Sequence, residues 1–186
     1  MPIPTFLARL SKINLSVFIF LSSIVVSAQL APLSPKATVS VLTCATGNES
    51  YSLFGHTAVR IADPEQFLDV VYNYGAFDFS TPNFVAKFAK GDLQYFVVAD
   101  SFSEFIGRYQ YEGRSVYEQK LRLSLPLKQQ LFDQLNKTLQ SEERFYTYKF
   151  IDRNCTTMVV DLLNQTIGTK AITKKDATEK TYREVL

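Results

Sequence analysis

The sequence predicts an α+β protein in which an antiparallel β-sheet is combined with packed helices. Three observations lead to this fold class. Short segments rich in β-branched and aromatic residues alternate between apolar and polar positions. A tight turn sequence joins two of these segments into an antiparallel hairpin. Stretches with helical periodicity and recognisable cap residues lie between and after the strands.

The N-terminal half of the chain contains most of the predicted strands. The β-branched segment 38–42 predicts a short strand, and a turn-forming stretch follows it. Residues 56–61 alternate so that Thr57, Val59 and Ile61 lie on one face, opposite His56, Ala58 and Arg60. The Asp-Pro turn at 62–65 joins this strand to the next one, over residues 68–74.

Helices and strands then alternate irregularly. Thr81-Pro82-Asn83 opens a helix that ends at Gly91, because a cap residue followed by proline is typical of a helix start. Ser101 or Ser103 caps a short helix that extends through Tyr109. The remaining elements are a strand over 93–98, a long strand over 114–124, a helix from Pro126, a strand or extended segment over 145–151, and a helix over 155–165.

The ends of the chain are predicted to lie outside the fold. Arg9 and Lys12 precede an apolar run over 13–26, and small residues follow it, which indicates a secretory signal peptide over 1–28. A retained membrane anchor is the alternative, disfavoured because the apolar run is short for a bilayer. We therefore predict an exported protein with a linker over 29–37, one folded domain over 38–167 and a polar tail over 168–186.

Composition excludes several functions. Without residues 1–28, which hold two of the 20 basic residues and none of the 18 acidic ones, the chain is formally neutral. Nucleic-acid binding requires a basic excess or stripe, so no nucleic-acid partner is expected. One histidine and two cysteines are too few for a zinc site, and no cofactor or metal is expected.

The chemistry-bearing residues are the single histidine, His56, and Cys155. Cys155 is predicted to open a helix that Asp152 or Asn154 caps, and it lies outside the apolar stripe of that helix. A helix N-terminus and a nearby imidazolium both lower the pKa of a thiol, which favours the nucleophilic thiolate. The pair therefore indicates a Cys–His nucleophile, although spacing alone leaves an inert cysteine and an ordinary strand histidine as alternatives.

Cys44 provides a competing explanation for Cys155. In an exported protein, two cysteines can form a disulfide, and a bond between Cys44 and Cys155 would remove the nucleophile. Cys44 follows a strand and enters a turn, which suits a small packing residue. We therefore predict that the two cysteines are not bonded to each other.

Several segments around these residues resemble one bacterial family, the N-terminal periplasmic domain of Lnb-type lipoprotein N-acyltransferases. The resemblance covers residues 38–167, and the combination of segments is more specific than any one of them. The segments are Leu42-Thr43-Cys44-Ala45-Thr46-Gly47, Phe54-Gly55-His56-Thr57-Ala58-Val59-Arg60, Tyr72-Asn73-Tyr74-Gly75-Ala76-Phe77-Asp78-Phe79, Tyr111-Glu112-Gly113-Arg114-Ser115-Val116-Tyr117 and Asp152-Arg153-Asn154-Cys155.

The resemblance implies a fold, a location and a reaction. The order of strand histidine first and helix cysteine last also resembles circularly permuted papain-like enzymes. The implied enzyme is a periplasmic thiol acyltransferase that works at the membrane surface. It would move an acyl chain from a phospholipid to Cys155 as a thioester, and then to the N-terminal amine of a lipoprotein acceptor. In this family a helical membrane region follows the domain, so the chain is expected to be a fragment or a short homologue.

The resemblance also assigns roles to residues. Cys155 would be the nucleophile and His56 the base. The third residue, which orients the imidazole, would be Asn73 on the strand paired with that of His56, and Tyr72 on the opposite face is its rival. Backbone N–H groups at the start of the Cys155 helix would stabilise the oxyanion.

Two other functions stay open at this point. One is a thiol hydrolase acting on amides or thioesters of the envelope, and the other is a binding module without catalysis. Arg60 and Arg114 could meet a lipid phosphate, although solvated arginines are the more ordinary interpretation. Core packing is likewise favoured over an acyl groove for the aromatic group Phe84, Phe88, Tyr95, Phe96, Phe102 and Phe105.

Overall fold

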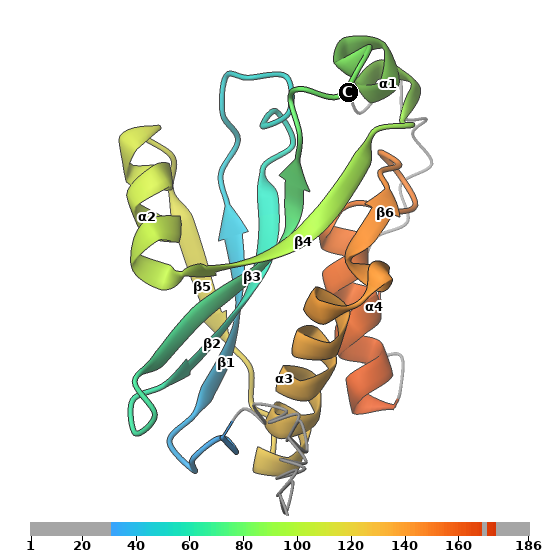
Figure 1. Ribbon diagram of the computed structural model, residues 1–186. Helices are drawn as coiled ribbons and strands as arrows, with labels where there is room; N and C mark the ends of the chain where they lie inside the picture. Colours follow the sequence, from blue (N-terminus) through green and yellow to red (C-terminus); the bar gives the residue numbers. More distant parts are fainter. Residues whose placement is uncertain (1–30, 169–170, 174–186) are drawn as a thin grey trace, which may run out of the picture. The chain divides into compact units, whose positions relative to one another are not determined.

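A computed structural model describes residues 31–168 and 171–173 of the chain (Figure 1). The predicted signal peptide over 1–28 lies outside the described residues, as do parts of the predicted linker and nearly all of the predicted tail. No helix within the described ranges has the length and apolarity needed to cross a bilayer.

The centre of the fold is a six-stranded antiparallel sheet in the order β5-β1-β2-β3-β4-β6, which confirms the predicted α+β class. The predicted hairpin is formed by its central strands β2 and β3. Whether the topology is a circular permutation of a papain-like fold stays a prediction. The strands are β1 (Thr38–Cys44), β2 (His56–Asp63), β3 (Leu68–Phe77), β4 (Gln94–Ser101), β5 (Val116–Lys120) and β6 (Phe145–Thr147).

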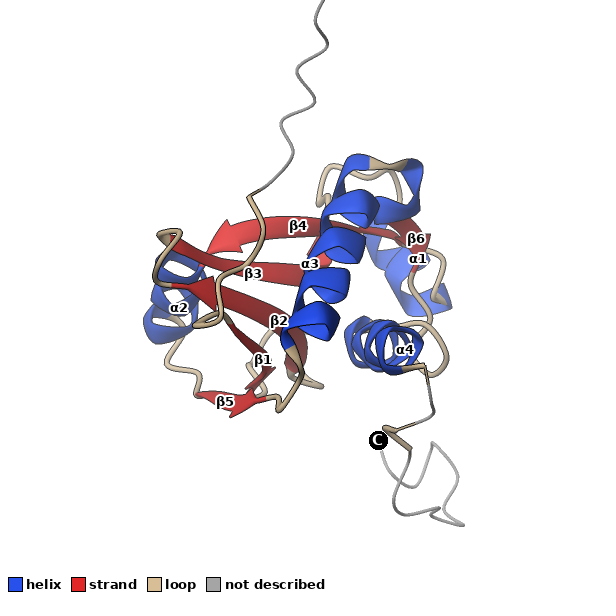
Figure 2. Ribbon diagram, turned by 90° about the horizontal axis from the view of Figure 1, so that it is seen from below, coloured by secondary structure: helices blue, strands red, loops and turns tan. Residues whose placement is uncertain are grey.

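Helices cover both faces of this sheet (Figures 1 and 2). α3 and α4 pack on one face, and α2 packs on the other. The short helix α1 connects β3 to β4 and has no buried residue. The α-helices are α1 (Phe84–Lys90), α2 (Phe102–Tyr111), α3 (Leu125–Gln140) and α4 (Cys155–Ile167), and a 3-10 turn, η1 (Glu142–Arg144), follows α3.

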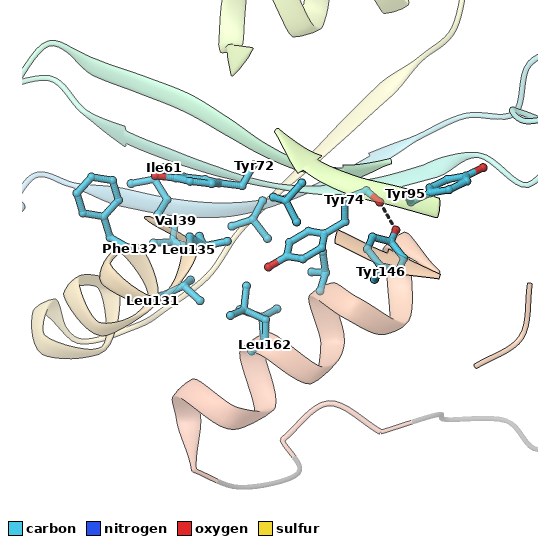
Figure 3. Packing of buried hydrophobic residues seen from close by; sticks show 14 of the residues in the cluster. Val39, Ile61, Tyr72, Tyr74, Tyr95, Leu131, Phe132, Leu135, Tyr146 and Leu162 are labelled. Carbon is cyan, nitrogen blue, oxygen red and sulfur yellow. Dashed lines mark hydrogen bonds between the residues drawn. The ribbon is translucent and has the colours of Figure 1, made fainter. Parts of the chain in front are cut away.

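The larger core lies between the sheet and the pair α3 and α4 (Figure 3). Val59 and Ile61 point into it, as the alternation in β2 predicts, and Leu135 and Leu162 meet them from the two helices. The Tyr146 hydroxyl donates a hydrogen bond to the Tyr74 carbonyl oxygen and so satisfies a polar group inside this core (Figure 3). The smaller core, under α2, consists of Leu42, Cys44, Ala58, Val71 and Phe105.

The predicted strand over 114–124 is too long, because β5 spans only Val116–Lys120. β5 pairs with β1 from Cys44↔Val116 to Ser40↔Lys120, and the Leu121 backbone N–H still donates to the Val39 carbonyl oxygen at 2.8 Å. The chain then turns tightly, since Leu123 donates its backbone N–H to the Leu121 carbonyl oxygen at 3.1 Å. Leu121 and Leu123 pack against the larger core, so the alternation in sequence continues past the end of the strand.

The predicted helix start at Thr81 is also corrected. Thr81 donates its backbone N–H to the Asp78 carbonyl oxygen in a turn, and α1 begins only at Phe84. Asn83 is the N-cap residue, in the left-handed region at φ 58°, without a side-chain cap hydrogen bond. Asparagine tolerates this conformation better than most residues. The predicted stop at Gly91 is confirmed, with φ at 67°.

The described part of the predicted linker, residues 31–37, contains no helix or strand but is attached to the fold. Leu33 and Ala37 are buried in the larger core. Ser34 donates hydrogen bonds from its backbone N–H and its hydroxyl to the buried Asp63 carboxylate, each at 2.6 Å. Burial opposes ionisation of Asp63, but the hydrogen bonds from Ser34 and from the backbone N–H groups of Glu65 and Gln66 together outweigh it and lower the pKa of this carboxyl.

Candidate active site

Cys155 is the first residue of α4, as its place in the sequence predicts. Asn154 is the N-cap residue, and its Oδ1 accepts a hydrogen bond from the Thr157 backbone N–H at 3.0 Å. The Thr157 hydroxyl accepts one from the Asn154 backbone N–H at 2.9 Å, which completes a reciprocal capping box. Of the two predicted cap residues, Asp152 and Asn154, the structure uses Asn154. This cap holds the thiol at the positive end of the helix dipole.

His56 is the first residue of β2, and its imidazole borders the same cleft as the Cys155 thiol. Its strand neighbour Ala58 points towards the α2 face, whereas α4 lies on the other face. The pairing of β2 with β3 ends at Ala58↔Asn73, where β3 contains a bulge before Ala76. His56 is thus paired with β1 but not with β3, and its imidazole lies close enough to the Cys155 thiol to lower the pKa of that thiol.

Asn73 orients the imidazole. The ring Nε2 lies 2.7 Å from Asn73 Oδ1. The same oxygen accepts the backbone N–H of Gly75 at 2.7 Å, and a side-chain nitrogen in its place could not accept that bond. Nε2 is therefore the donor and carries a proton. In the neutral imidazole this leaves the Nδ1 lone pair free to accept the proton of the thiol.

Gly75 provides the space in which the ring lies. A Cβ at this position would come within 2.5 Å of His56 Cε1 and 3.1 Å of His56 Nδ1. Any side chain at position 75 would therefore push the imidazole away from its place beside Asn73. The sequence shows Gly75 only as an interruption of the β3 pattern, which is typical of a bulge or of close backbone approach.

The electrostatics of the Cys155 thiol favour the thiolate. Burial opposes ionisation, but four contacts outweigh it and lower the pKa. These are the hydrogen bond and positive charge of His56, the backbone N–H of Thr57 and the hydroxyl of Thr156. The hydroxyls of Thr57 and Thr156 also hydrogen bond to each other at 2.8 Å, which fixes the start of β2 against the start of α4.

Cys44 is a free cysteine, as is Cys155. It pairs with His56 in the β1–β2 ladder and is buried in the smaller core. Burial raises its pKa to about 11, although a hydrogen bond with Tyr109 and the charge of Arg114 act in the opposite direction. The predicted absence of a bond between the two cysteines therefore agrees with the structure, and Cys44 is a neutral packing residue.

Tyr72, the rival third residue, lies away from His56. Its side chain is buried in the larger core and its hydroxyl donates a hydrogen bond to Asn136 Oδ1 at 3.0 Å. The structure thus brings Cys155, His56 and Asn73 together and leaves Tyr72 out. Their catalytic roles stay predictions.

Arg60 and Arg114, for which the sequence left two interpretations, both interact with other groups of the protein. Arg60 forms an ion pair with Asp69 at 2.7 Å and its guanidinium lies over the Phe102 ring. Arg114 pairs with Glu112 at 2.7 Å and donates from Nε to the Ala45 carbonyl oxygen. Neither side chain is a freely solvated arginine. Of these two arginines, Arg114 borders the cleft around Cys155 and Arg60 does not.

This cleft has a volume of about 760 Å³, within the range of about 300–1,000 Å³ that is common for ligand sites. Cys155, His56, Asn73 and Gly75 all border it. One part of its wall is aromatic and aliphatic: Tyr51, Phe54, Phe77, Phe88, Tyr95, Tyr148, Phe150 and Ile151. Another part is polar, with Arg108, Tyr109, Glu112 and Arg114. An amphipathic molecule therefore finds both an apolar and a charged wall beside the thiol.

The predicted aromatic group divides between several places. Phe88 and Tyr95 border the cleft, and Phe105 is buried under α2. Phe102 contacts Arg60, and Phe96 contacts Phe145. Phe84 packs against Phe77, Phe79 and Phe88. Core packing, the favoured interpretation, holds for Tyr95, which is buried in the larger core, and for Phe84 and Phe88, which pack against it, while Phe88 and Tyr95 also border the cleft. The larger apolar wall comes from residues that the sequence pattern did not single out, such as Phe150.

The described residues, 31–168 and 171–173, include no group of three or more His, Cys, Asp or Glu side chains arranged to hold a metal ion. Fold and site together define an α+β protein with a Cys–His–Asn array at the N-terminus of a helix. The family model for the Lnb N-terminal periplasmic domain matches residues 27–186, and the chain belongs to this family. The domain is accordingly periplasmic, as predicted. No curated protein and no solved structure matched the chain.

Proposed function

We propose that this protein is a thiol acyltransferase that takes an acyl chain from a phospholipid and transfers it to the N-terminal amine of a lipoprotein. The observation that carries the proposal is the location of the Cys155–His56–Asn73 array at a cleft that has one aromatic wall. The array supplies an activated nucleophile, and the wall supplies a surface for an alkyl chain.

In the first half-reaction, Cys155 attacks the ester carbonyl carbon of the lipid. His56 Nδ1 accepts the thiol proton as the carbon–sulfur bond forms, while Asn73 keeps Nε2–H in place. Backbone N–H groups at the start of α4 stabilise the oxyanion, an effect typically worth about 3–4 kcal/mol. When the ester carbon–oxygen bond breaks, the imidazolium returns its proton to the leaving glycerol oxygen. The products are a lysolipid and an S-acyl Cys155.

In the second half-reaction, the acceptor amine attacks the thioester. The new carbon–nitrogen bond forms, the carbon–sulfur bond breaks, and His56 transfers the proton lost by the amine to the departing sulfur. The product is an amide, and the free thiol is restored. A thioester suits this sequence because amines attack thioesters readily while the acyl group stays activated.

The cleft also supports an amphipathic donor over a short polar one. The apolar wall is formed by the loop before β2, by β3, α1 and β4, and by the segment before α4, and the polar wall by the end of α2 and the residues after it. A lipid whose alkyl chain lies on the first wall and whose polar part lies on the second brings its ester group to the region between them. His56 and Cys155 border the same cleft as both walls.

Intact-mass measurement after incubation with phospholipid vesicles tests the proposal. We expect an adduct of one acyl chain on the wild-type protein, removed by neutral hydroxylamine, and no adduct on Cys155→Ser. The matched control is Cys44→Ala, which removes the other cysteine and should still form the adduct. The ester source is varied between vesicles and a synthetic diacylated lipopeptide. If the wild type forms no adduct with either source, the proposal is contradicted.

The acceptor is tested by adding a lipopeptide with a free N-terminal amine to the acylated protein. Formation of an N-acyl lipopeptide with loss of the adduct supports transfer. Release of free fatty acid at an equal rate with and without the lipopeptide would instead identify a thiol hydrolase. This comparison is needed because the choice between amine and water depends on how well the loaded site excludes water.

A further inference from the structure

Aromatic side chains form a continuous surface around the mouth of the cleft. Ring contacts lead from Phe54 to Phe150 at 6.4 Å and from Phe150 to Phe88 at 5.3 Å between ring centroids. They continue through Phe84 and Phe79 to Tyr51, which belongs to the same loop as Phe54. We call these six residues, Tyr51, Phe54, Phe79, Phe84, Phe88 and Phe150, the aromatic rim.

The rim is exposed to an extent that folding alone does not explain. Phe54 is 58% exposed and Phe79 is 63% exposed. Leu53 and Ile151, which flank rim residues in sequence, are also exposed, and Val85 on α1 is 77% exposed. Single exposed apolar residues are ordinary, but a joined apolar surface of this kind usually marks a place where something binds.

Charge around the rim distinguishes between possible occupants. α1 carries Lys87 and Lys90 in its last turn and no acidic residue in its first. Within residues 31–168 and 171–173 neither lysine forms an ion pair. Aromatic residues beside unpaired lysines are typical of surfaces that lie in the interface of a bilayer, where the rings enter the head-group region and the lysines meet lipid phosphates.

We propose that the aromatic rim and α1 dock the domain on a lipid bilayer with the mouth of the cleft towards the lipid. The inference rests on the proposed function in one respect, which is that an acyl donor must leave the bilayer to reach Cys155. A second copy of the chain on the rim would cover the cleft instead of supplying it. A docked bilayer lets an acyl chain pass between the rim residues that border the cleft, Tyr51, Phe54, Phe88 and Phe150.

The absence of tryptophan from the sequence makes a direct test possible. Phe54→Trp and Phe79→Trp each place one fluorescent probe in the rim. The matched control is Phe67→Trp, because Phe67 is 98% exposed but lies in the turn after β2, at the opposite end of that strand from His56. All three variants replace one exposed aromatic ring by another, so the fold should be retained.

The bilayer is a vesicle of equimolar phosphatidylcholine and phosphatidylglycerol. Each tryptophan is introduced into the full chain in which Cys155 is replaced by serine. Every variant contains the same residues 1–30, so any lipid affinity of that segment is common to all of them. We expect the emission of the probes at 54 and 79 to shift to the blue on vesicles and to be quenched by brominated lipid tails. The probe at 67 should show neither effect. Equal responses at 54, 79 and 67, or no response at 54 and 79, would overturn the docking proposal.

Partition measurements extend the test to energetics. Phe54→Ser and Phe79→Ser should each lower the partition coefficient by about tenfold, whereas Phe67→Ser should leave it unchanged. Lys87→Gln combined with Lys90→Gln should weaken binding to the phosphatidylglycerol vesicles and leave binding to pure phosphatidylcholine unchanged. If the serine variants in the rim abolish a dimer seen in the absence of lipid, the occupant is a second copy and the proposal is wrong.

Failure of docking and failure of the proposed function are distinguishable. Docking is measured on Cys155→Ser, which cannot form a thioester. An acyl adduct on the wild type from detergent-dispersed lipid, together with no insertion of the rim probes, would retain the acyltransferase and reject the docking surface. Insertion of the rim probes without any adduct would do the reverse.

Discussion

The two cysteines have opposite ionisation behaviour although both lie near the same end of the sheet. Cys44 ends β1 and Cys155 begins α4, and burial disfavours the thiolate of both. The pKa of Cys44 is raised to about 11, whereas the pKa of Cys155 is lowered. The difference comes from the partners. Cys44 has a single hydrogen-bonding hydroxyl from Tyr109, whereas Cys155 has His56, a backbone N–H and a threonine hydroxyl.

This comparison shows that the surroundings of a cysteine, and not the residue type alone, decide whether its thiol ionises. Burial alone produces an inert cysteine, and several donors aimed at the sulfur produce a nucleophile. The donors around Cys155 come from the start of β2 and the start of α4, which the Thr57–Thr156 hydrogen bond joins. Changes that remove these donors should make Cys155 resemble Cys44, and they provide the tests below.

The largest expected effect is the difference in reactivity between the two thiols. At neutral pH, iodoacetamide should label Cys155 in the folded protein and leave Cys44 unlabelled until the protein is unfolded, because the reacting species is the thiolate. Peptide mass mapping of folded and denatured samples checks this. Cys155→Ser should then lose all labelling of the folded state. Labelling of Cys44 in folded Cys155→Ser would show that the assigned environments are wrong.

Replacement of the imidazole should have the next largest effect. In His56→Ala the hydrogen bond and charge that lower the Cys155 pKa are lost while burial remains, so the pKa of this thiol should rise. We expect the pH profile of iodoacetamide labelling to move to higher pH. The rate of acyl adduct formation should fall by about 10²–10⁴-fold, the usual contribution of a general base. An unchanged profile, with thermal unfolding also unchanged, would remove His56 from the site.

Substitutions of Asn73 should show which property of this residue matters. Its Oδ1 accepts two hydrogen bonds, from His56 Nε2 and from the Gly75 backbone N–H. Asn73→Asp keeps an acceptor oxygen at that position, whereas Asn73→Ala removes it. We therefore expect Asn73→Ala to slow adduct formation by about 10–100-fold and Asn73→Asp to retain considerably more activity. Equal rates for the two variants would show that the side chain does not orient the imidazole.

Gly75→Ala tests the space around the imidazole without removing any polar group. The new methyl group would lie 2.5 Å from His56 Cε1, so the ring must move. We expect about a tenfold loss in adduct formation and a shift of the labelling profile towards that of His56→Ala. Gly107→Ala on α2 is the matched control, because a Cβ there meets no atom within 4 Å. A loss of activity in Gly107→Ala equal to that in Gly75→Ala would point to a general effect on the fold.

The sequence predicted the residue types of the site better than their contacts. A single histidine restricts any Cys–His chemistry to His56, and cap residues before an apolar helix indicate the position of Cys155. That the two meet depends on the end of β2–β3 pairing at Asn73, on the bulge that follows, and on the missing side chain at Gly75. These are long-range features, and local periodicity does not encode them.

The fold shows the same limit. Alternation and turn chemistry predicted the β2–β3 hairpin, because register and turn are local there. β5 ends where the chain turns tightly at Leu121–Leu123 and packs both leucines into the larger core, and the alternating pattern continues through that turn, so the predicted strand was too long. The apolar wall of the cleft combines the loop before β2, β3, α1, β4 and the segment before α4. Neither Phe54 nor Phe150 has a periodic pattern that would have indicated a shared surface.

The smallest expected effect concerns stability at alkaline pH. The pKa of Cys44 rises from 9.0 to about 11 on folding, so between these values the folded state retains a proton that the unfolded state has lost. Its contribution to the free energy of unfolding is fully present below pH 9.0 and is lost as the pH rises through about 11. The contribution is about 3 kcal/mol at most, because a change of one in pKa corresponds to about 1.4 kcal/mol. Cys155, with its lowered pKa, should contribute with the opposite sign.

Urea unfolding of the wild type and of Cys44→Ala between pH 8 and pH 11 measures this contribution, with each titration referred to its own value at pH 8. Tyr72, Tyr74 and Tyr95, whose pKa values burial raises, destabilise both proteins alike at high pH, so the difference between the two curves reports Cys44 together with its hydrogen-bond partner Tyr109. The wild type should lose more stability than Cys44→Ala as the pH rises. Parallel curves would mean that Cys44 has an ordinary thiol pKa, and the contrast with Cys155 would then lie in His56 alone.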